Sequence, residues 1–106
     1  MHQTVGFSNV NISRWAPDAP GIYRVFLGKI CLYVGSARDQ TLKDRLKQHW
    51  RGSHSRRLGM WIRCHGKALT VEFCVVEAKN LSRIKEIEQD QINKFSPMVN
   101  LINARG

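Results

Sequence analysis

Residues 20–35 have the sequence PGIYRVFLGKICLYVG, in which two strand-like runs, residues 21–27 and 29–35, flank Gly28. Both runs are rich in β-branched, aromatic and aliphatic residues, and a glycine at the junction permits the backbone conformation of a tight turn. The stretch therefore predicts a β-hairpin. Because most positions are apolar rather than alternating, we expect this hairpin to be covered on both faces in the middle of a small sheet.

The hairpin carries one tyrosine on each strand, Tyr23 and Tyr33. A three-residue loop at residues 27–29 would pair the two tyrosines directly and place them on one face, whereas a two-residue turn would place them on opposite faces. We expect the three-residue loop. On the hairpin alone, two ordinary core tyrosines with hydrogen-bonded hydroxyl groups also explain the pattern.

The composition indicates a single globular domain, residues 1–106, with a polyanionic partner. Lys and Arg number 17 against 8 Asp and Glu, which gives a net charge of +9, and 42% of the residues are hydrophobic. Nucleic acid fits this charge better than a membrane surface, because the sequence has no long apolar run, no strongly amphipathic basic helix and no signal peptide. We therefore expect a cytoplasmic protein associated with the nucleoid.

The cysteines are odd in number and far apart, at positions 31, 64 and 74. They form neither a disulfide framework nor a paired zinc motif, so we expect reduced and mostly buried thiols. A site built from Cys64, His65 and Cys74 would have the wrong ligand number and spacing for structural zinc.

Residues 42–51 predict a helix that begins after Thr41, with Asp44 in place for a capping-box-like pair. Its buried stripe is predicted from three apolar residues spaced by four: Leu42, Leu46 and Trp50. Arg45 and His49 lie beside this stripe and are expected to point toward the edge of the core. Such a basic pair is explained either by an arginine that extends from the core margin or by an anion clamp.

Residues 56–64 predict a short helix after a linker at residues 52–55, and residues 69–77 predict a third strand, antiparallel to one strand of the hairpin. Basic residues gather near Trp50 and Trp61 in this region: Arg51, Arg56, Arg57, Arg63 and Lys67. Charge mixed with aromatic rings is typical of a surface that follows the phosphates of DNA. A solvated basic face is the alternative interpretation.

The last predicted helix, residues 81–95, begins at a cap at Asn80 or Ser82 and carries an anomaly. Glu88 lies four residues after Ile84 and four before Ile92, so the same face would bury a carboxylate. A buried carboxylate needs a partner because its desolvation is costly. A salt bridge, for instance to Arg45, is one explanation, and metal coordination or acid–base chemistry is the other.

The two ends of the chain give weaker patterns. Residues 1–19 contain scattered apolar side chains without periodicity and are expected to wrap an edge of the core. After Pro97, residues 98–103 are expected to be extended, with Asn100 between apolar neighbours.

The two hairpin strands contain Gly21-Ile22-Tyr23 and Tyr33-Val34-Gly35, and with these the chain resembles the GIY-YIG nuclease family over residues 20–102. Valine in place of the second isoleucine is nearly isosteric. The resemblance implies that Tyr23 and Tyr33 are the two motif tyrosines, that Arg45 is the catalytic arginine and that His49 is a histidine found in many members. It also implies that Glu88 is the metal-binding glutamate and that Asn100 is the supporting asparagine of a terminal P-x-x-N.

The resemblance implies a metal-dependent DNA endonuclease with an α/β (α+β) fold, a small three-stranded antiparallel sheet flanked by helices. Glu88 would hold one Mg²⁺ or Mn²⁺ and Arg45 would clamp a phosphate oxygen. Tyr23 would act as general base or position the water. The role of general base requires its pKa to fall by about 3 units. Tyr33 and His49 would orient the water or assist proton transfer, and Asn100 would fix a hydroxyl group or the metal shell.

Family members commonly carry a separate DNA-binding module, and because the resemblance covers residues 20–102 of the sequence, we expect this protein to act without one. Specificity for double-stranded or branched DNA, such as a repair intermediate, a junction, a flap or a recognition site, would come from the basic surface, a homodimer or a partner protein. The competing interpretation is a non-catalytic nucleic-acid-binding module that keeps the fold.

Overall fold

The computed structural model describes residues 3–52 and 56–104. They form a four-stranded sheet in the order β1-β4-β2-β3, in which every neighbouring pair is antiparallel. The strands are β1 (Gln3–Gly6), β2 (Gly21–Leu27), β3 (Ile30–Ala37) and β4 (Leu69–Val75). The predicted α+β class is confirmed, and the predicted number of strands is too small by one.

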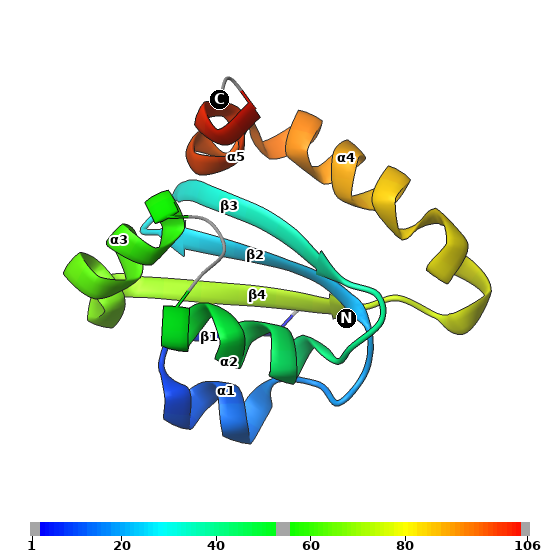
Figure 1. The fold of residues 1–106 in the computed structure, drawn as a ribbon, viewed down its shortest axis with the longest axis horizontal. Helices are drawn as coiled ribbons and strands as arrows, with labels where there is room; N and C mark the ends of the chain where they lie inside the picture. The colour runs from blue at the N-terminus through cyan, green and yellow to red at the C-terminus, as the bar shows by residue number, and fades with distance from the viewer. Residues whose placement is uncertain (1–2, 53–55, 105–106) are drawn as a thin grey trace.

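Five α-helices and two short 3₁₀ turns accompany the sheet. They are α1 (Asn9–Trp15), α2 (Leu42–Gly52), α3 (Arg56–His65), η1 (Gly66–Ala68), η2 (Ala78–Arg83), α4 (Ile84–Phe95) and α5 (Met98–Ala104). Figure 1 shows α1 and α2 on one side of the sheet, α4 beyond β3 on the other side, and α3 at one end. None of the helices in the described ranges has the length and apolar character that crossing a membrane requires.

The hairpin turns differently from the expectation, although its two tyrosines share a face. Leu27 pairs with Ile30 across a two-residue turn whose first residue, Gly28, has a φ of 59°, the position that a type II′ turn gives to glycine. The register then shifts between Val25 and Phe26, so that Val25 pairs with Tyr33 and Tyr23 pairs with Gly35. The predicted three-residue loop and the direct pairing of the tyrosines are therefore wrong.

The register shift places Tyr33 on the same face as Tyr23, which the two-residue turn alone would not do. Phe26 pairs with Cys31 and Val25 with Tyr33, which leaves Leu32 as an extra residue on β3. One extra residue reverses the side-chain alternation of the following part of the strand. Tyr33 is consequently moved onto the face of Tyr23, and their ring centroids lie 6.2 Å apart.

The prediction that the hairpin lies in the middle of the sheet is correct for one of its two strands. Strand β2 is central, between β4 and β3, whereas β3 is the edge strand and is covered by α4 and α5. The third predicted strand is confirmed as β4, antiparallel to β2. The missed strand is β1, which pairs with β4; its four residues are too few to show a period of two.

The predicted helix at residues 42–51 is confirmed as α2. The Asp44 N–H donates to Thr41 Oγ1 at 3.1 Å, which is the predicted cap. Leu42 and Leu46 are buried as expected, but Trp50 is 37% exposed and stacks on Phe7 with a centroid distance of 5.9 Å. The helix at residues 56–64 is confirmed as α3, and residues 53–55 of the predicted linker lie outside the described ranges.

The C-terminal part is more helical than expected. The chain enters α4 through the 3₁₀ turn η2, and the residue that precedes α4 is Arg83, so neither predicted cap is used. Ser96 ends α4 in the left-handed conformation, with a φ of 47°. A new helical turn then begins, because the Leu101 N–H donates to the Pro97 carbonyl at 3.1 Å. The extended structure predicted for residues 98–103 is therefore wrong.

The sheet buries a hydrophobic core on each face. The larger core contains Tyr23, Val25 and Leu32 with residues of α1, α2 and α3, and the smaller contains Ile22 and Val34 with residues of α4. The cysteines are free, as predicted: Cys31 is buried, Cys74 is half-buried and Cys64 is exposed, contrary to the expectation for that residue. Burial raises the pKa of the Cys31 thiol to about 11.

Candidate active site

Three rings meet on the face of the sheet that α2 covers. Tyr23 Oη lies 2.6 Å from His49 Nε2, and the His49 ring centroid lies 5.5 Å from that of Tyr23 and 5.7 Å from that of Tyr33. The expectation that the tyrosines share a face and that His49 points inward is thus confirmed. The rings come from β2, β3 and α2, so sheet register and helix packing together form the cluster.

Close packing leaves no space for a side chain at the motif glycines Gly21 and Gly35. A Cβ atom on Gly35 would lie 2.3 Å from Tyr23 Oη and 2.4 Å from its Cζ, because the tyrosine ring lies across the neighbouring strand. A Cβ atom on Gly21 would lie 2.3 Å from the Cys74 carbonyl oxygen and 2.7 Å from Leu42 Cδ1. Gly35 therefore makes room for the ring cluster, and Gly21 allows β2 to approach β4 and α2.

The two tyrosines differ in exposure. Tyr23 is 1% exposed and His49 is 2% exposed, whereas Tyr33 is half-buried. Desolvation by burial raises the pKa of both phenols above the ordinary value; for Tyr23 the neighbouring Tyr33 adds to this, and the charge and hydrogen bond of Arg45 oppose it. The protein thus shifts the pKa of Tyr23 opposite to the direction expected for a general base, and Tyr33 is the tyrosine that faces water.

Arg45 lies on α2 one turn before His49 and is half-buried. Its charge lowers the pKa of both tyrosines, so its guanidinium lies close to both phenols. Arg45 Nη1 donates to Gln48 Oε1 at 3.4 Å, and Gln48 Nε2 donates to Gln40 Oε1 at 2.8 Å. These two glutamines were not among the predicted site residues, and no pattern in the residue types connects them with the site.

Glu88, on α4, approaches the same cluster. Its side chain is 20% exposed, it lies 4.0 Å from Lys85 Nζ, and its charge raises the pKa of both tyrosines. Among residues 3–52 and 56–104, no group of three or more His, Cys, Asp or Glu side chains could hold a metal ion. A single partly exposed carboxylate nevertheless fits Mg²⁺, which keeps several waters and is bound by one or two carboxylates together with substrate phosphates.

Asn100 acts on the backbone of β3. Its Oδ1 accepts the Val34 N–H at 2.7 Å, and its Nδ2 donates to the Val34 carbonyl at 2.8 Å. The amide therefore replaces a neighbouring strand at the edge of the sheet, between Tyr33 and Gly35. The observed contacts of the amide are both with Val34, and the predicted role of Asn100 toward a hydroxyl group or a metal shell stays a prediction.

Solved structures with this fold agree with the geometry. The GIY-YIG N-terminal endonuclease domain of UvrC from Thermotoga maritima, bound to its catalytic divalent cation magnesium, is 24% identical; the TM-score is 0.62, over 84% of this chain and 94% of that domain. A point mutant of the same domain, bound to its catalytic divalent cation, is 23% identical with a TM-score of 0.61, over 84% and 93% of the two chains. This chain has the GIY-YIG fold. No protein-family model matches the sequence, and a search of the curated proteins gives no match.

Within the GIY-YIG fold, a polar network around Arg24 attaches helix α4, which carries Glu88, to the sheet. Arg24, on the opposite face of β2 from Tyr23, pairs with Glu72 at 2.8 Å and donates to Gln91 Oε1 on α4. Its guanidinium also lies 4.7 Å from the ring centroid of Phe95. Sequence reasoning missed Arg24; the one indication was that polar Gln91 falls on the same helix face as Glu88.

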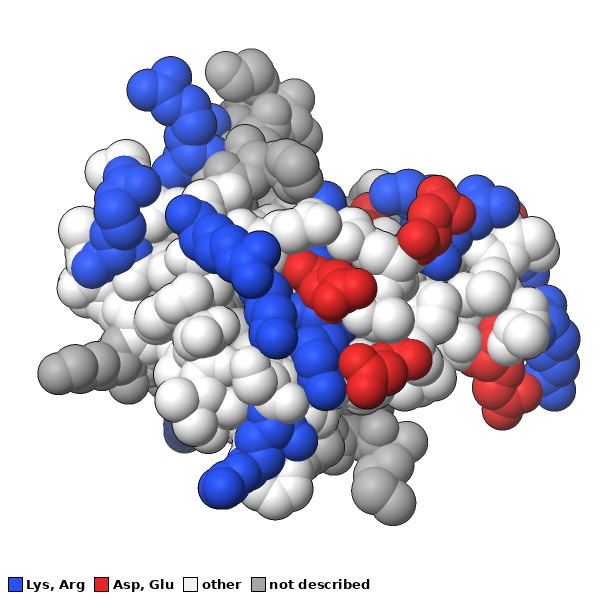
Figure 2. All heavy atoms as spheres, turned by 60° about the horizontal axis from the view of Figure 1, so that its bottom comes forward, with Lys and Arg blue, Asp and Glu red and all other residues white. Residues whose placement is uncertain are grey.

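The predicted DNA-binding arginines lie on helices α2 and α3, and Lys67 lies in the following turn η1. Arg51, Arg56, Arg57 and Arg63 are exposed, and the side chain of Lys67 lies outside what the structure describes. Figure 2 turns the lower side of Figure 1 toward the viewer and shows basic side chains in a diagonal row, with acidic side chains at its edge. The predicted arginines therefore contribute positive charge to the solvent-exposed surface.

Proposed function

We propose that this protein is a metal-dependent DNA endonuclease. The observation that carries the proposal is the convergence of Arg45, Glu88 and the Tyr33-Tyr23-His49 cluster within a GIY-YIG fold. The similar solved domains are endonuclease domains bound to a catalytic divalent cation, in one case magnesium. That likeness supports Mg²⁺ or Mn²⁺ as the cofactor here, and DNA as the substrate would place the protein with the cytoplasmic nucleoid.

Phosphodiester hydrolysis needs an activated water, neutralised phosphoryl oxygens and stabilisation of the leaving 3′ oxygen. Glu88 is the residue that would hold the cation. When bound, the cation would stabilise the negative charge of the phosphate and of the leaving group. Arg45 would bind a non-bridging phosphate oxygen, for which its planar fork of donors is better suited than a lysine.

The ring cluster provides a route for the proton of the attacking water. Tyr33 is half-buried, the centroid of its ring lies 6.2 Å from that of Tyr23, and Tyr23 Oη lies 2.6 Å from His49 Nε2. With its ring proton on Nδ1, His49 accepts the Tyr23 proton, Tyr23 accepts that of Tyr33, and Tyr33 accepts that of the water. His49 ends with the added proton, so no isolated phenolate forms, which matters because burial raises the pKa of both phenols.

Asn100 would act as a positioning residue in this scheme. By holding both backbone groups of Val34, it fixes the position of Tyr33 on an edge strand that otherwise lacks a neighbour on that side. The DNA backbone would lie on the arginines of α2 and α3 and on Lys67. A homodimer or a partner protein would add specificity for double-stranded or branched DNA.

Plasmid cleavage tests the proposal. Purified protein is expected to nick or linearise supercoiled DNA with Mg²⁺ or Mn²⁺, and Glu88→Ala is expected to abolish this. Glu86→Gln is the matched control, since Glu86 lies on the same helix but is exposed and pairs with Arg83. Intact plasmid with both cations from neutral to alkaline pH, or full cleavage by Glu88→Ala, would rule out the enzyme; binding without cleavage would instead support the non-catalytic module.

Charge reversal tests the binding surface separately. Arg56→Glu with Arg57→Glu is expected to weaken DNA binding and to reduce its salt dependence, because each phosphate contact adds to the number of released counterions. Lys79→Glu is the control, since η2 and α3 lie at opposite ends of the molecule (Figure 1). An unchanged affinity and salt slope in the double variant would show that DNA lies elsewhere.

A further inference from the structure

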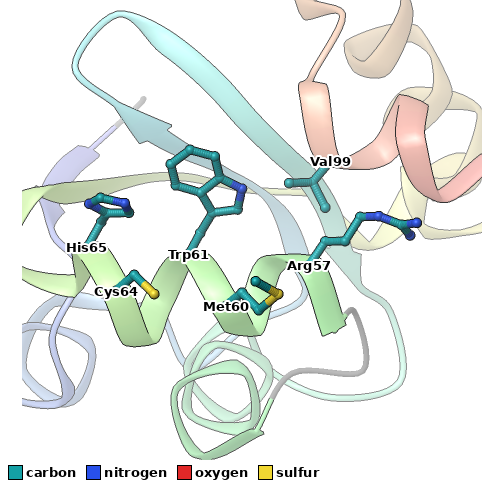
Figure 3. A pocket seen from close by; sticks show the side chains of 6 residues that line it. All are labelled: Arg57, Met60, Trp61, Cys64, His65 and Val99. Carbon is teal, nitrogen blue, oxygen red and sulfur yellow. The ribbon is translucent and has the colours of Figure 1, made fainter.

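Helices α3 and α5 enclose a hollow that the proposed mechanism does not use. Its volume is about 420 Å³, within the range of small-ligand sites. Its lining consists of Arg57, Met60, Trp61, Cys64, His65 and Val99. Figure 3 shows five of these side chains along one helix, α3, with Val99 of α5 facing them.

The walls of the hollow are mainly apolar and aromatic. The half-buried Trp61 ring has the His65 ring beside it, with centroids 5.1 Å apart and planes inclined by 36°. Met60, on the same side of α3, is 56% exposed. A flat aromatic or heteroaromatic group is the shape and chemistry that such rings bind by stacking.

The surroundings of the hollow are basic. Arg57 is part of its wall, and Arg56 and Arg63 are exposed on the same helix. A second hollow of about 480 Å³ on the other flank of α3 shares Cys64 and His65 and is lined by Trp50 and Arg63. Rings for bases next to arginines for phosphates are the features of a single-strand binding surface. The charge favours a nucleotide over an apolar protein side chain.

The hollow adjoins the candidate active site through α5. Val99 forms its wall, and the next residue, Asn100, holds the backbone of β3 between Tyr33 and Gly35. One wall of the hollow and the residue that supports β3 beside Tyr33 are thus consecutive in helix α5.

We propose that this hollow binds an unpaired nucleobase of the DNA substrate, stacked on Trp61 with Arg57 on the adjoining phosphate. The inference rests on the proposed function and extends it, because it names the substrate class: DNA that contains unpaired nucleotides beside the scissile bond. A regular duplex keeps its bases stacked within the helix and offers no free base face to Trp61.

A binding assay with the full chain carrying Glu88→Ala separates this inference from catalysis. The ligands are a paired duplex and the same duplex with a short unpaired stretch containing 2-aminopurine. We expect about 10-fold tighter binding of the second DNA, with quenching of the 2-aminopurine fluorescence by stacking. Equal affinity for the two DNAs, or no quenching on binding, would overturn the inference even if the active protein cuts plasmid.

Two variants test the hollow itself. Trp61→Leu is expected to remove the preference and the quenching but to keep the affinity for the duplex, and Met60→Gln, at an exposed position, should weaken the preference without changing the charge or disturbing the core. Trp15→Leu is the matched control, because Trp15 is exposed on α1 and does not line the hollow. Retention of the preference by both folded variants would contradict the proposal, whereas a preference without any cleavage would leave it intact and overturn the enzymatic function.

Discussion

Tyr23 and Arg24 are adjacent on the central strand, both buried, and they face opposite sides of the sheet. Arg24, 8% exposed, has an oppositely charged partner at 2.8 Å in Glu72, an acceptor in Gln91 and an aromatic face at 4.7 Å in Phe95. Tyr23, 1% exposed, bonds to the His49 ring, and burial raises the pKa of its phenol. One group is paired with an opposite charge within the protein, and the other belongs to the ring cluster for which we propose proton transfer.

This difference separates a structural polar group from a chemical one. Burying a polar or charged group costs free energy unless partners compensate. Around Arg24 the compensation is complete and joins β2, β4 and α4. Around Tyr23 the arginine and the glutamate act on the same phenols with opposite effects on their pKa values, an arrangement that a phosphate and a cation would complete. Burial of a polar residue alone therefore does not indicate function; its partners do.

The largest expected effect on stability is that of Arg24→Met. The change leaves Glu72 and Gln91 without their partner and should lower the free energy of unfolding by about 3 kcal/mol. Urea denaturation measures this. The control is Arg83→Met, which removes an exposed pair with Glu86 and should cost less than about 0.5 kcal/mol. Equal stability of the Arg24 variant and the wild type would contradict the structural role.

A smaller effect is expected on the other face from Gly35→Ala. The new Cβ would overlap the Tyr23 ring, and such overpacking costs about 2 kcal/mol. Adding Tyr23→Ala should give a non-additive result in a double-mutant cycle, because the clash then has no second partner. Gly52→Ala is the control, since a Cβ there meets nothing within 4 Å. Additive effects of the two changes would show that the ring does not lie over Gly35.

The pH dependence of stability gives the smallest effect. Burial raises the pKa of Tyr23 in the folded protein, so the unfolded chain releases this proton first, at about pH 10. The contribution of Tyr23 to the free energy of unfolding is then constant below about pH 10 and falls by about 1.4 kcal/mol for each pH unit above it. Tyr23→Phe removes this contribution. Urea unfolding of both proteins at about pH 9 and 11 should show the smaller loss in the variant; equal losses would mean that the phenol is not desolvated.

The sequence predicted the elements that depend on long apolar periodicity. Helix α2 and the inward positions of Arg45 and His49 followed from a stripe spaced by four, and Glu88 was identified because a carboxylate interrupted a similar stripe. The hairpin itself was equally clear, although its loop is one residue shorter than predicted. These features are local, so the pattern of residues is sufficient to place them.

The errors concern features that only packing decides. The extra residue Leu32, which brings Tyr33 to the face of Tyr23, leaves no mark in the residue types. Strand β1 is too short for a period, and α5 restarts after a left-handed Ser96, where proline predicted a stop. The depth at which each tyrosine lies depends on α2 and β3 together, so the difference in exposure between Tyr23 and Tyr33 was not predictable from the motif.

In the proposed mechanism Tyr33, rather than Tyr23, meets the attacking water. Single-turnover cleavage of DNA by Tyr33→Phe, at saturating Mg²⁺ and protein, distinguishes the two tyrosines. We predict a fall of about 10³-fold in the rate, with unchanged DNA affinity and folding, because loss of general base catalysis costs about 10² to 10⁴-fold. A Tyr33→Phe protein that cuts at the wild-type rate, while Tyr23→Phe is folded and inactive, would return the water-facing role to Tyr23 and contradict this account.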